Sequence, residues 1–246
     1  MHAYEIKKNI SYYSNPQDKY QIERCKLDLY LPSSKNFKTI VWFHGGGLTS
    51  GEKNFPENLM KERLAIIAVN YRLSPKVKVQ KCIEDSAAAI AWVYRNIEIY
   101  GGNKKQFFIS GHSAGGYLTM MATMAPQYLK PYGLCVMNFK ALIPLSGHTI
   151  THFTAREELK LKDTDVIVDS QAPLHFINQK LPPIYLITGD RDLEMLGRYE
   201  ENAYMWRMLK ITGHKETYLK ELPGHDHGNM VDPGTVIVAD YVLSFD

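Results

Sequence analysis

Short apolar runs alternate along this chain with longer segments that carry one apolar face, and this alternation predicts a mixed α/β protein. Residues 64–70 are nearly all apolar, as expected for a central parallel strand that is buried on both faces. Residues 27–31 instead alternate between apolar and polar side chains, which indicates an early antiparallel strand. Further strands are predicted over residues 39–43, 106–109, 141–145, 183–188 and 216–222.

Amphipathic segments lie between these strands and predict helices. Residues 82–100 form the longest of them, and the glycine pair at 101–102 is expected to end that helix. Pro233 is expected in the first turn of the last helix, where its missing N–H costs nothing. Helices are predicted over residues 82–100, 117–124, 196–211 and 233–242. With no repeat, linker or low-complexity tract, the pattern predicts one α/β domain over residues 1–246, with a mostly parallel sheet and helices on both faces.

A serine lies between the predicted strand 106–109 and the predicted helix 117–124, in the stretch GHSAGG at residues 111–116. The stretch contains G-x-S-x-G, a strand–turn–helix signature that raises a serine hydroxyl above the sheet. Glycines flank such a turn because side chains would collide with neighbouring elements. The motif favours Ser113 as a nucleophile. Since three fixed positions match by chance roughly 0.1 times in a chain of this length, the assignment depends on what accompanies it.

The second motif, HGGG at residues 44–47, directly follows the predicted strand 39–43. An enzyme that transfers acyl groups must stabilise the negative oxygen that forms when serine attacks a carbonyl, and backbone N–H groups can do so. Successive glycines let the chain come close enough, so HGGG upstream of the nucleophile favours the oxyanion loop of lipases and esterases over a flexible turn. We expect the N–H groups of Gly46, Gly47 and Ala114 to form the oxyanion hole.

Three motifs in this order, HGGG at 44–47, VNYRLSP at 69–75 and GHSAGG at 111–116, resemble the hormone-sensitive-lipase-like branch of the α/β-hydrolases. That branch includes small bacterial esterases, feruloyl-esterase-like proteins and kynurenine formamidases. The resemblance runs from about residue 27 to the C-terminus and is weakest over 149–180. It implies an α/β-hydrolase fold with a sheet of about eight strands, in which residues 149–180 are a short cap-like insertion.

The serine needs a base, and the base needs an orienting acid. In this fold the chain order is serine, then Asp or Glu, then histidine. The loop after the predicted strand 183–188 offers Asp190 and Asp192, and the loop after 216–222 offers His225 and His227. Both loops follow late strands, at the edge where an α/β sheet places its site.

The resemblance favours one candidate in each loop, and the other candidate remains as the alternative. The family pattern G-x-x-D-x-L fits Asp192, although Leu193 comes one residue early and the usual proline is missing. Asp190 is then left to bond backbone N–H groups of the turn. The family's histidine is followed by Gly or Phe, which fits His227, and His225 is left to bond a backbone carbonyl. A metal site at HDH is disfavoured because no third ligand is clustered there.

These residues predict a serine hydrolase that cleaves carboxylic esters through an acyl-enzyme, with Ser113, His227 and Asp192 as the triad and without a metal or cofactor. The small cap suggests a short acyl group, such as acetyl, and Phe153 and residues 174–176 are candidates to line the site. The alternatives are an arylformamidase acting on N-formylkynurenine and an esterase of the feruloyl or acetyl-xylan type. An inactive ligand-binding relative is disfavoured, because every required residue type is present.

Composition agrees with a globular enzyme whose partner is a small-molecule ester. Hydrophobic residues make up 45% of the chain and charged residues 22%, which are ordinary values. The net charge of +3 is small and spread out, so nucleic-acid binding is not indicated. No apolar run approaches the ~18 residues of a membrane span, and residues 1–13 lack the apolar region of a signal peptide. We expect a cytoplasmic protein with three free thiols; a periplasmic or secreted protein with its leader removed would read the same.

Three further polar residues invite a functional role. Arg72 follows the strand 64–70 and is placed to contact an anionic substrate, but we expect it to bond backbone carbonyls or a nearby carboxylate instead. His44 is expected to shape the oxyanion loop. Asp85 is expected early in its helix, where the helix dipole favours a negative charge.

Overall fold

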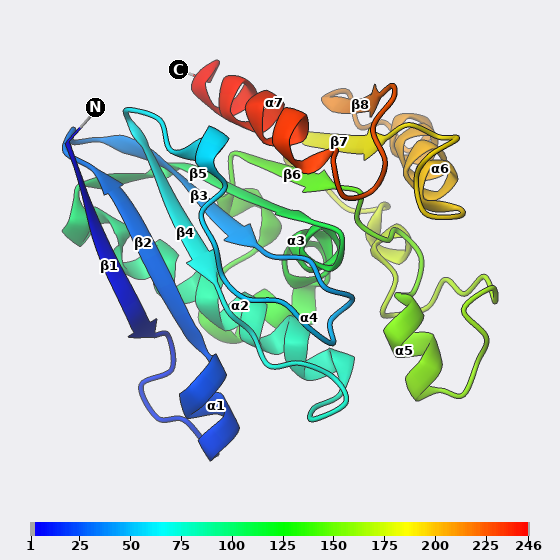
Figure 1. The fold of residues 1–246 in the computed structure, drawn as a ribbon, viewed down its shortest axis with the longest axis horizontal. Coiled ribbons are helices and arrows are strands. Elements are labelled where there is room, and N and C mark those ends of the chain that lie inside the picture. The colour runs from blue at the N-terminus through cyan, green and yellow to red at the C-terminus, as the bar shows by residue number, and fades with distance from the viewer. Residues whose placement is uncertain (1–2, 246) are drawn as a thin grey trace.

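The structure, a computed structural model, describes residues 3–245 and is built on one eight-stranded sheet (Figure 1). The strand order is β1-β2-β4-β3-β5-β6-β7-β8. β2 pairs antiparallel with both β1 and β4, and all other neighbours are parallel, so the predicted mostly parallel sheet is confirmed. The strands are β1 Tyr4–Ser11, β2 Lys26–Pro32, β3 Phe37–Phe43, β4 Leu64–Val69, β5 Gly102–His112, β6 Ala141–Leu145, β7 Ile184–Gly189 and β8 Thr217–Leu222.

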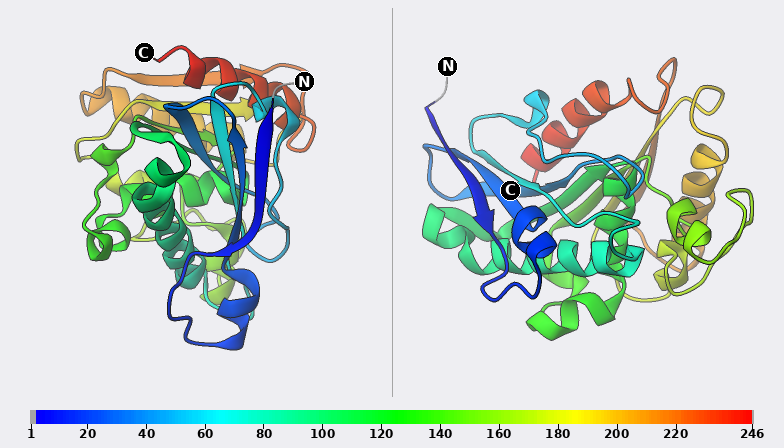
Figure 2. Two further views of the ribbon diagram at one scale, coloured as in Figure 1. Left: turned by 90° about the vertical axis from the view of Figure 1, so that its left-hand side faces the viewer. Right: turned by 60° about the horizontal axis from the view of Figure 1, so that its bottom comes forward.

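Helices cover both faces of the sheet, as predicted (Figure 2). α2, α3 and α6 contribute side chains to one core, whereas α7 and the short helix η1 contribute to a second core on the other face. The α-helices are α1 Lys19–Arg24, α2 Val79–Asn96, α3 Ala114–Met124, α4 Pro126–Leu129, α5 Phe153–Glu158, α6 Arg198–Ile211 and α7 Val231–Leu243. The 3-10 helices are η1 Glu57–Leu59, η2 Ile97–Tyr100, η3 Lys130–Tyr132, η4 Val136–Asn138 and η5 Pro173–Phe176. No helix among residues 3–245 combines the length and the apolar composition that crossing a membrane requires.

Two elements differ from the sequence-based predictions. β1 was not predicted, because its side chains are mostly exposed at the edge of the sheet and show no apolar alternation. Residues 1 and 2, which precede it, lie outside the described residues. α2 begins at Val79, three residues before the predicted start, and passes into η2, whose C-cap is Gly101 with a positive φ of 95°. Asp85 therefore lies in the second turn of α2, buried, and not at the N-terminus of the helix.

Parallel pairing places the carboxyl ends of five strands on the same side of the sheet, namely β3, β5, β6, β7 and β8. The glycine loop follows β3, and the candidate nucleophile directly follows β5. The candidate acids follow β7 and the candidate histidines follow β8. Segments that are far apart in the sequence therefore meet at a single rim.

Candidate active site

Ser113 occupies a strained turn between β5 and α3. Its φ is 57° and its ψ is −118°, a backbone conformation that residues other than glycine rarely adopt. A Cβ on Gly111 would lie 2.6 Å from the carbonyl of Gly115, and a Cβ on Gly115 would lie 2.0 Å from the carbonyl oxygen of Phe43. The Ser113 N–H donates to the carbonyl of Leu145 at 2.8 Å. The two glycines therefore let the turn close against β3, and the hydroxyl is held at the rim.

The hydroxyl of Ser113 is hydrogen-bonded to His227. The distance from Nε2 to Oγ is 2.8 Å, so the structure brings together two of the three residues predicted for the triad. The other ring nitrogen, Nδ1, lies 2.7 Å from Oε2 of Glu194. A hydroxyl, an imidazole and a carboxylate thus form one continuous chain of hydrogen bonds, the arrangement of a Ser-His-acid triad.

Glu194 is fixed by four hydrogen bonds. Besides His227, the hydroxyl of Ser146 and the backbone N–H of Gly189 donate to Oε1, and the N–H of Met195 donates to Oε2 at 2.9 Å. Burial alone would raise the pKa of Glu194, but the bonds from His227 and Ser146 outweigh it and lower the pKa to about 2. The carboxylate is therefore ionised across the physiological range.

The prediction that Asp192 is the acid is wrong. Asp192 is exposed, and the carboxylate bonded to His227 belongs to Glu194, two residues further along the loop. The carbonyl of Asp190 accepts from the N–H groups of Leu193 and Glu194, at 3.0 and 2.8 Å, and these bonds curl the loop into a tight turn. The turn leaves Asp192 outside and directs Glu194 inward. The sequence carried two signs that the acid lies elsewhere, namely the early Leu193 and the missing proline. The chain order of the triad allows either Asp or Glu as the acid, so Glu194 is compatible with it.

Asp190 and His225 have the structural roles that were predicted as their alternatives. The carboxylate of Asp190 accepts from the N–H groups of Asp192 and Gly224, at 3.0 and 2.7 Å. These bonds lower the pKa of Asp190. Nδ1 of His225 bonds the carbonyl of Pro223 at 3.0 Å. The part of the chain that the structure describes holds no cluster of three metal-ligating side chains.

The glycine loop lies directly against the nucleophile. A Cβ on Gly45 would lie 3.3 Å from Cβ of Ser113, and both Gly46 and Gly47 adopt a positive φ. Ala114 is the first residue of α3, so its N–H has no acceptor within the helix. Within residues 3–245, the N–H groups of Gly46 and Gly47 bond to no oxygen. Among the described residues, the N–H groups of Gly46 and Gly47 are therefore free to bind an oxyanion, and Ala114 follows the serine directly, so the three donors predicted for the oxyanion hole remain a prediction.

His112 is a residue whose part in the site was not predicted. Its Nε2 donates to the backbone carbonyl of His227 at 2.8 Å, and the two ring centroids are 4.7 Å apart. Burial lowers the pKa of His112 to about 4, so the ring is neutral near pH 7. A Cβ on Gly45 would lie 3.3 Å from its other ring nitrogen. His112 thus bridges the oxyanion loop and the histidine loop; it occupies a variable position of the serine motif, which gave no signal of this.

We expect His112→Ala to lower kcat about fivefold with little change in KM, because a lost hydrogen bond of about 1 kcal/mol lets the His227 loop shift. His112→Gln keeps an N–H donor near the same position and is expected to restore most of the loss. Steady-state kinetics of the two variants checks this. A glutamine variant as impaired as the alanine variant would show that the donated bond is not what matters.

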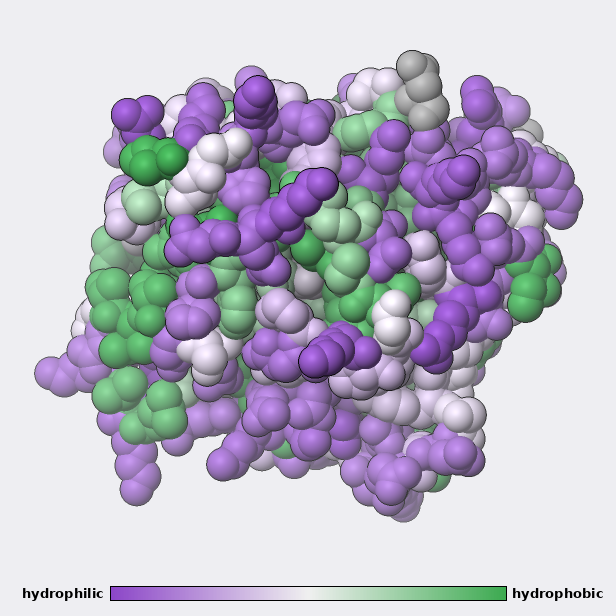
Figure 3. Space-filling view, turned by 180° about the vertical axis from the view of Figure 1, so that it is seen from behind, coloured by the Kyte–Doolittle hydropathy of each residue, from purple (hydrophilic) through white to green (hydrophobic). Residues whose placement is uncertain are grey.

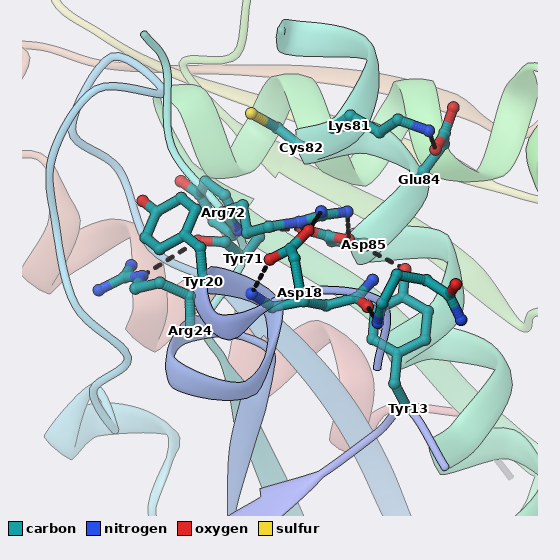
Figure 4. A network of polar contacts seen from close by, with 12 residues as sticks. Tyr13, Asp18, Tyr20, Arg24, Tyr71, Arg72, Lys81, Cys82, Glu84 and Asp85 are labelled. Carbon is teal, nitrogen blue, oxygen red and sulfur yellow. Dashed lines mark hydrogen bonds and ion pairs between the residues drawn. The ribbon is translucent and has the colours of Figure 1, made fainter. Parts of the chain in front are cut away.

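Arg72 is part of a structural network away from the triad (Figure 4). Its guanidinium makes two bonds of 2.8 Å to Asp85 and a third of 3.2 Å to Asp18, at the N-cap of α1. Tyr13 also donates to Asp85, at 2.9 Å. The expected bond to a nearby carboxylate is confirmed. The network fastens α1 and the N-terminal segment to α2.

His44 packs under the glycine loop, as expected. Its ring stacks on Tyr71 with centroids 4.5 Å apart, and Nδ1 bonds the carbonyl of Gly45 at 2.7 Å. The Tyr71 hydroxyl donates to the backbone carbonyl of His44 at 2.9 Å. Burial lowers the pKa of His44 to about 4, so it supports the loop as a neutral ring.

Removing Asp85 is expected to lower the free energy of unfolding by about 3 kcal/mol, since it leaves the buried Arg72 without its main partner. Glu84→Ala is the matched control, because Glu84 is the adjacent residue of α2 and pairs with Lys81 at the surface. That change is expected to cost about 1 kcal/mol or less. Urea unfolding of Asp85→Ala and Glu84→Ala gives the comparison, and equal losses would contradict the role assigned to the network.

Comparison with known proteins supplies independent findings. The BD-FAE family model matches residues 27–196. The esterase LipC of Mycobacterium tuberculosis is 26% identical over 220 residues, which cover 79% of this chain and 54% of LipC. The chain therefore spans about half the length of that relative.

Solved structures share the fold across nearly the whole chain. A truncated carbohydrate esterase from gut microbiota superposes with a TM-score of 0.80 at 18% identity, covering 98% of this chain and 96% of that one. Esterase 2 of Thermogutta terrifontis, phosphonylated by cyclosarin, gives a TM-score of 0.74 at 24% identity, with coverage of 98% and 93%. Both confirm the α/β-hydrolase sheet.

Proposed function

We propose that this chain, which belongs to the BD-FAE family within the hormone-sensitive-lipase-like α/β-hydrolases, is a serine hydrolase that cleaves carboxylic esters. The observation that carries the proposal is the row from Ser113 through His227 to Glu194, with bonds of 2.8 and 2.7 Å. The esterases among its relatives and structural neighbours support the same reaction class.

The geometry suggests the following sequence of steps. Oγ of Ser113 attacks the ester carbonyl while Nε2 of His227 takes its proton, and Glu194 stabilises the imidazolium that forms. The N–H groups of Gly46, Gly47 and Ala114 bind the oxygen that gains negative charge. His227 then gives its proton to the leaving alcohol, and an acyl-enzyme remains. Water attacks the acyl-enzyme with His227 again as the base, which releases the acid and restores Ser113.

Labelling with a fluorophosphonate probe tests this proposal directly. We expect the folded protein to react at Ser113, identified by mass spectrometry of the modified peptide, and the heat-denatured protein not to react. Hydrolysis of methyl, phenyl and 4-nitrophenyl acetates by the unlabelled enzyme is the second readout. A protein that neither labels nor hydrolyses any ester would be a ligand-binding relative instead.

The short acyl group predicted from the sequence remains a proposal. It is tested by measuring kcat/KM for 4-nitrophenyl esters from acetate to octanoate. We expect the acetate ester to give the highest kcat/KM of the series. N-formylkynurenine belongs in the same comparison, because the arylformamidase alternative uses the same three side-chain roles. A higher kcat/KM for this formamide than for every ester would replace ester hydrolysis with formamide hydrolysis.

A further inference from the structure

β1, Tyr4–Ser11, is an edge strand of the sheet, and within residues 3–245 no strand pairs with its outer side. The left panel of Figure 2 faces this edge and shows β1 in front, with no helix of the described chain over it. An edge strand presents unpaired N–H and C=O groups, which makes it a template for a strand of another chain. What can pair with β1 therefore depends on which of its backbone groups face outward.

The register with β2 identifies the outward groups. Ser33 donates its N–H to the carbonyl of Ala3 at 3.1 Å, so these two residues are a hydrogen-bonded pair of the antiparallel ladder. Such pairs occur at every second residue, so the backbone groups of Glu5 and Lys7 also face β2. The backbone groups that face the open edge belong to Tyr4, Ile6 and Lys8.

A second copy of this chain presents the same edge, and a closed dimer with two-fold symmetry would run the two β1 strands antiparallel. Hydrogen bonds then form only where outward-facing residues of both copies stand opposite each other. This condition permits registers centred on Glu5, on Ile6 or on Lys7, whereas a centre between two residues is excluded.

The charges of β1 select one of these registers. Glu5 and Lys7 lie on one face of the strand, where Oε1 and Nζ are 2.6 Å apart and the side chains are 61% and 37% exposed. A centre at Glu5 sets two carboxylates opposite each other, and a centre at Lys7 sets two ammonium groups opposite each other; both arrangements are destabilising. A centre at Ile6 sets each Glu5 opposite Lys7 of the other copy, where the opposite charges attract. The sequence of β1 is thus complementary to itself in this register.

Apolar groups flank the open edge. Tyr4 and Ile6 are 51% and 39% exposed, and the Tyr4 ring lies 4.9 Å from that of Tyr30. Beside β1 is a hollow of about 550 Å³, and its lining includes Ile99, which is 78% exposed. A second copy paired in the register centred on Ile6 would bring the two Ile6 side chains together and cover part of this surface.

Charge has more weight at this edge than apolar area. In the face that Figure 3 shows, hydrophobic side chains gather at the end where α5 and α6 lie, and Figure 1 places β1 at the other end. Backbone bonds and opposite charges, and not a broad apolar patch, would therefore hold two copies together. Attraction between exposed charges weakens as the ionic strength rises, so the association should be weaker in high salt.

We propose that two copies of this chain associate through β1 into one continuous sheet, with the two strands antiparallel and centred on Ile6. Lysines on an edge strand usually oppose such pairing, but in this register each Lys7 meets a Glu5. A strand of a different protein is a poorer occupant, because the order of charges about Ile6 matches a second copy of itself. The inference does not depend on the proposed function, since β1 does not contribute to the rim that carries Ser113.

Sedimentation velocity over a range of protein concentrations measures the association. Glu5→Lys makes both charged positions positive and Lys7→Glu makes both negative, so each variant alone should raise the Kd of the dimer at least tenfold. An equimolar mixture of the two variants should restore association, because the positive positions of one then meet the negative positions of the other. Glu84→Lys is the matched control, since Glu84 also pairs with a lysine at the surface, on α2, and this change should leave the Kd unaltered.

Ile6→Pro tests the backbone bonds. Proline has no N–H, and the N–H of Ile6 faces outward, so the change removes a bond of the dimer but none of the ladder between β1 and β2. The variant should keep wild-type thermal unfolding and raise the Kd at least tenfold.

A wild-type protein that stays monomeric at about 100 μM, far above the micromolar Kd of weak specific interfaces, overturns the inference. A dimer whose Kd is raised neither by the charge reversals nor by Ile6→Pro also overturns it, because another surface then holds the copies together. Charge variants whose mixture does not associate overturn the register centred on Ile6. None of these outcomes alters the proposed ester hydrolysis.

Discussion

Ser113→Ala is expected to lower kcat for ester hydrolysis by a factor on the order of 10⁶, the effect of removing the nucleophile from a triad that acts as a unit. In the proposed mechanism the hydroxyl oxygen of Ser113 forms the acyl bond, and it lies 2.8 Å from Nε2 of His227, the proposed base. Alanine keeps the strained backbone at φ 57° but offers no atom to attack. Residual activity would then come from water that attacks the ester carbonyl while the backbone N–H groups stabilise the oxyanion.

The loss must be separated from a loss of folding. Ser244→Ala is a suitable control, because that serine is exposed and its hydroxyl donates to the carbonyl of Tyr241 near the end of the described residues. Both variants should show wild-type thermal unfolding, since neither removes core packing. An alanine variant at 113 that retains a tenth of the wild-type kcat would refute the assignment of this nucleophile.

The buried strands were predictable from local pattern alone. β6 matches the predicted residues 141–145 without an error, because a strand covered on both faces leaves a continuous apolar run. β1 was not predictable in this way, since an edge strand with exposed side chains has no such run. Register and strand order also depend on long-range pairing, which no local window contains.

The site was predictable where a local backbone requirement fixes it. Ser113 and the glycine loop are marked by motifs because their turns admit few residue types. The acid is different, since any carboxylate in the loop after β7 is a candidate until the course of the backbone there is known. The turn that Asp190 makes selects Glu194 over Asp192. The longer side chain of glutamate suits a position farther along the loop.

Replacing Glu194 with glutamine is expected to lower kcat by roughly 10⁴, because an amide no longer favours the tautomer in which Nε2 of His227 can accept the serine proton. The shape of the side chain is nearly unchanged, so the effect reports charge and not packing. Steady-state kinetics on 4-nitrophenyl acetate measures it. Glu194→Asp should be intermediate, as the shorter side chain keeps the charge but does not reach Nδ1 equally well.

Asp192→Asn is the control that decides between the two acids. Asp192 is exposed and makes no bond to His227, so kcat should change less than twofold. A large loss at 192 together with a small loss at 194 would reverse the assignment.

Stability offers a second readout of the same carboxylate, through its pKa. The hydrogen bonds lower the pKa of Glu194 in the folded protein from 4.5 to about 2, so its charge stabilises the fold above pH 4.5. That contribution is lost as the pH falls towards 2. The difference in free energy of unfolding between wild type and Glu194→Gln should therefore shrink over this interval. A constant difference for Glu194→Gln would show that the four hydrogen bonds do not stabilise the charged form.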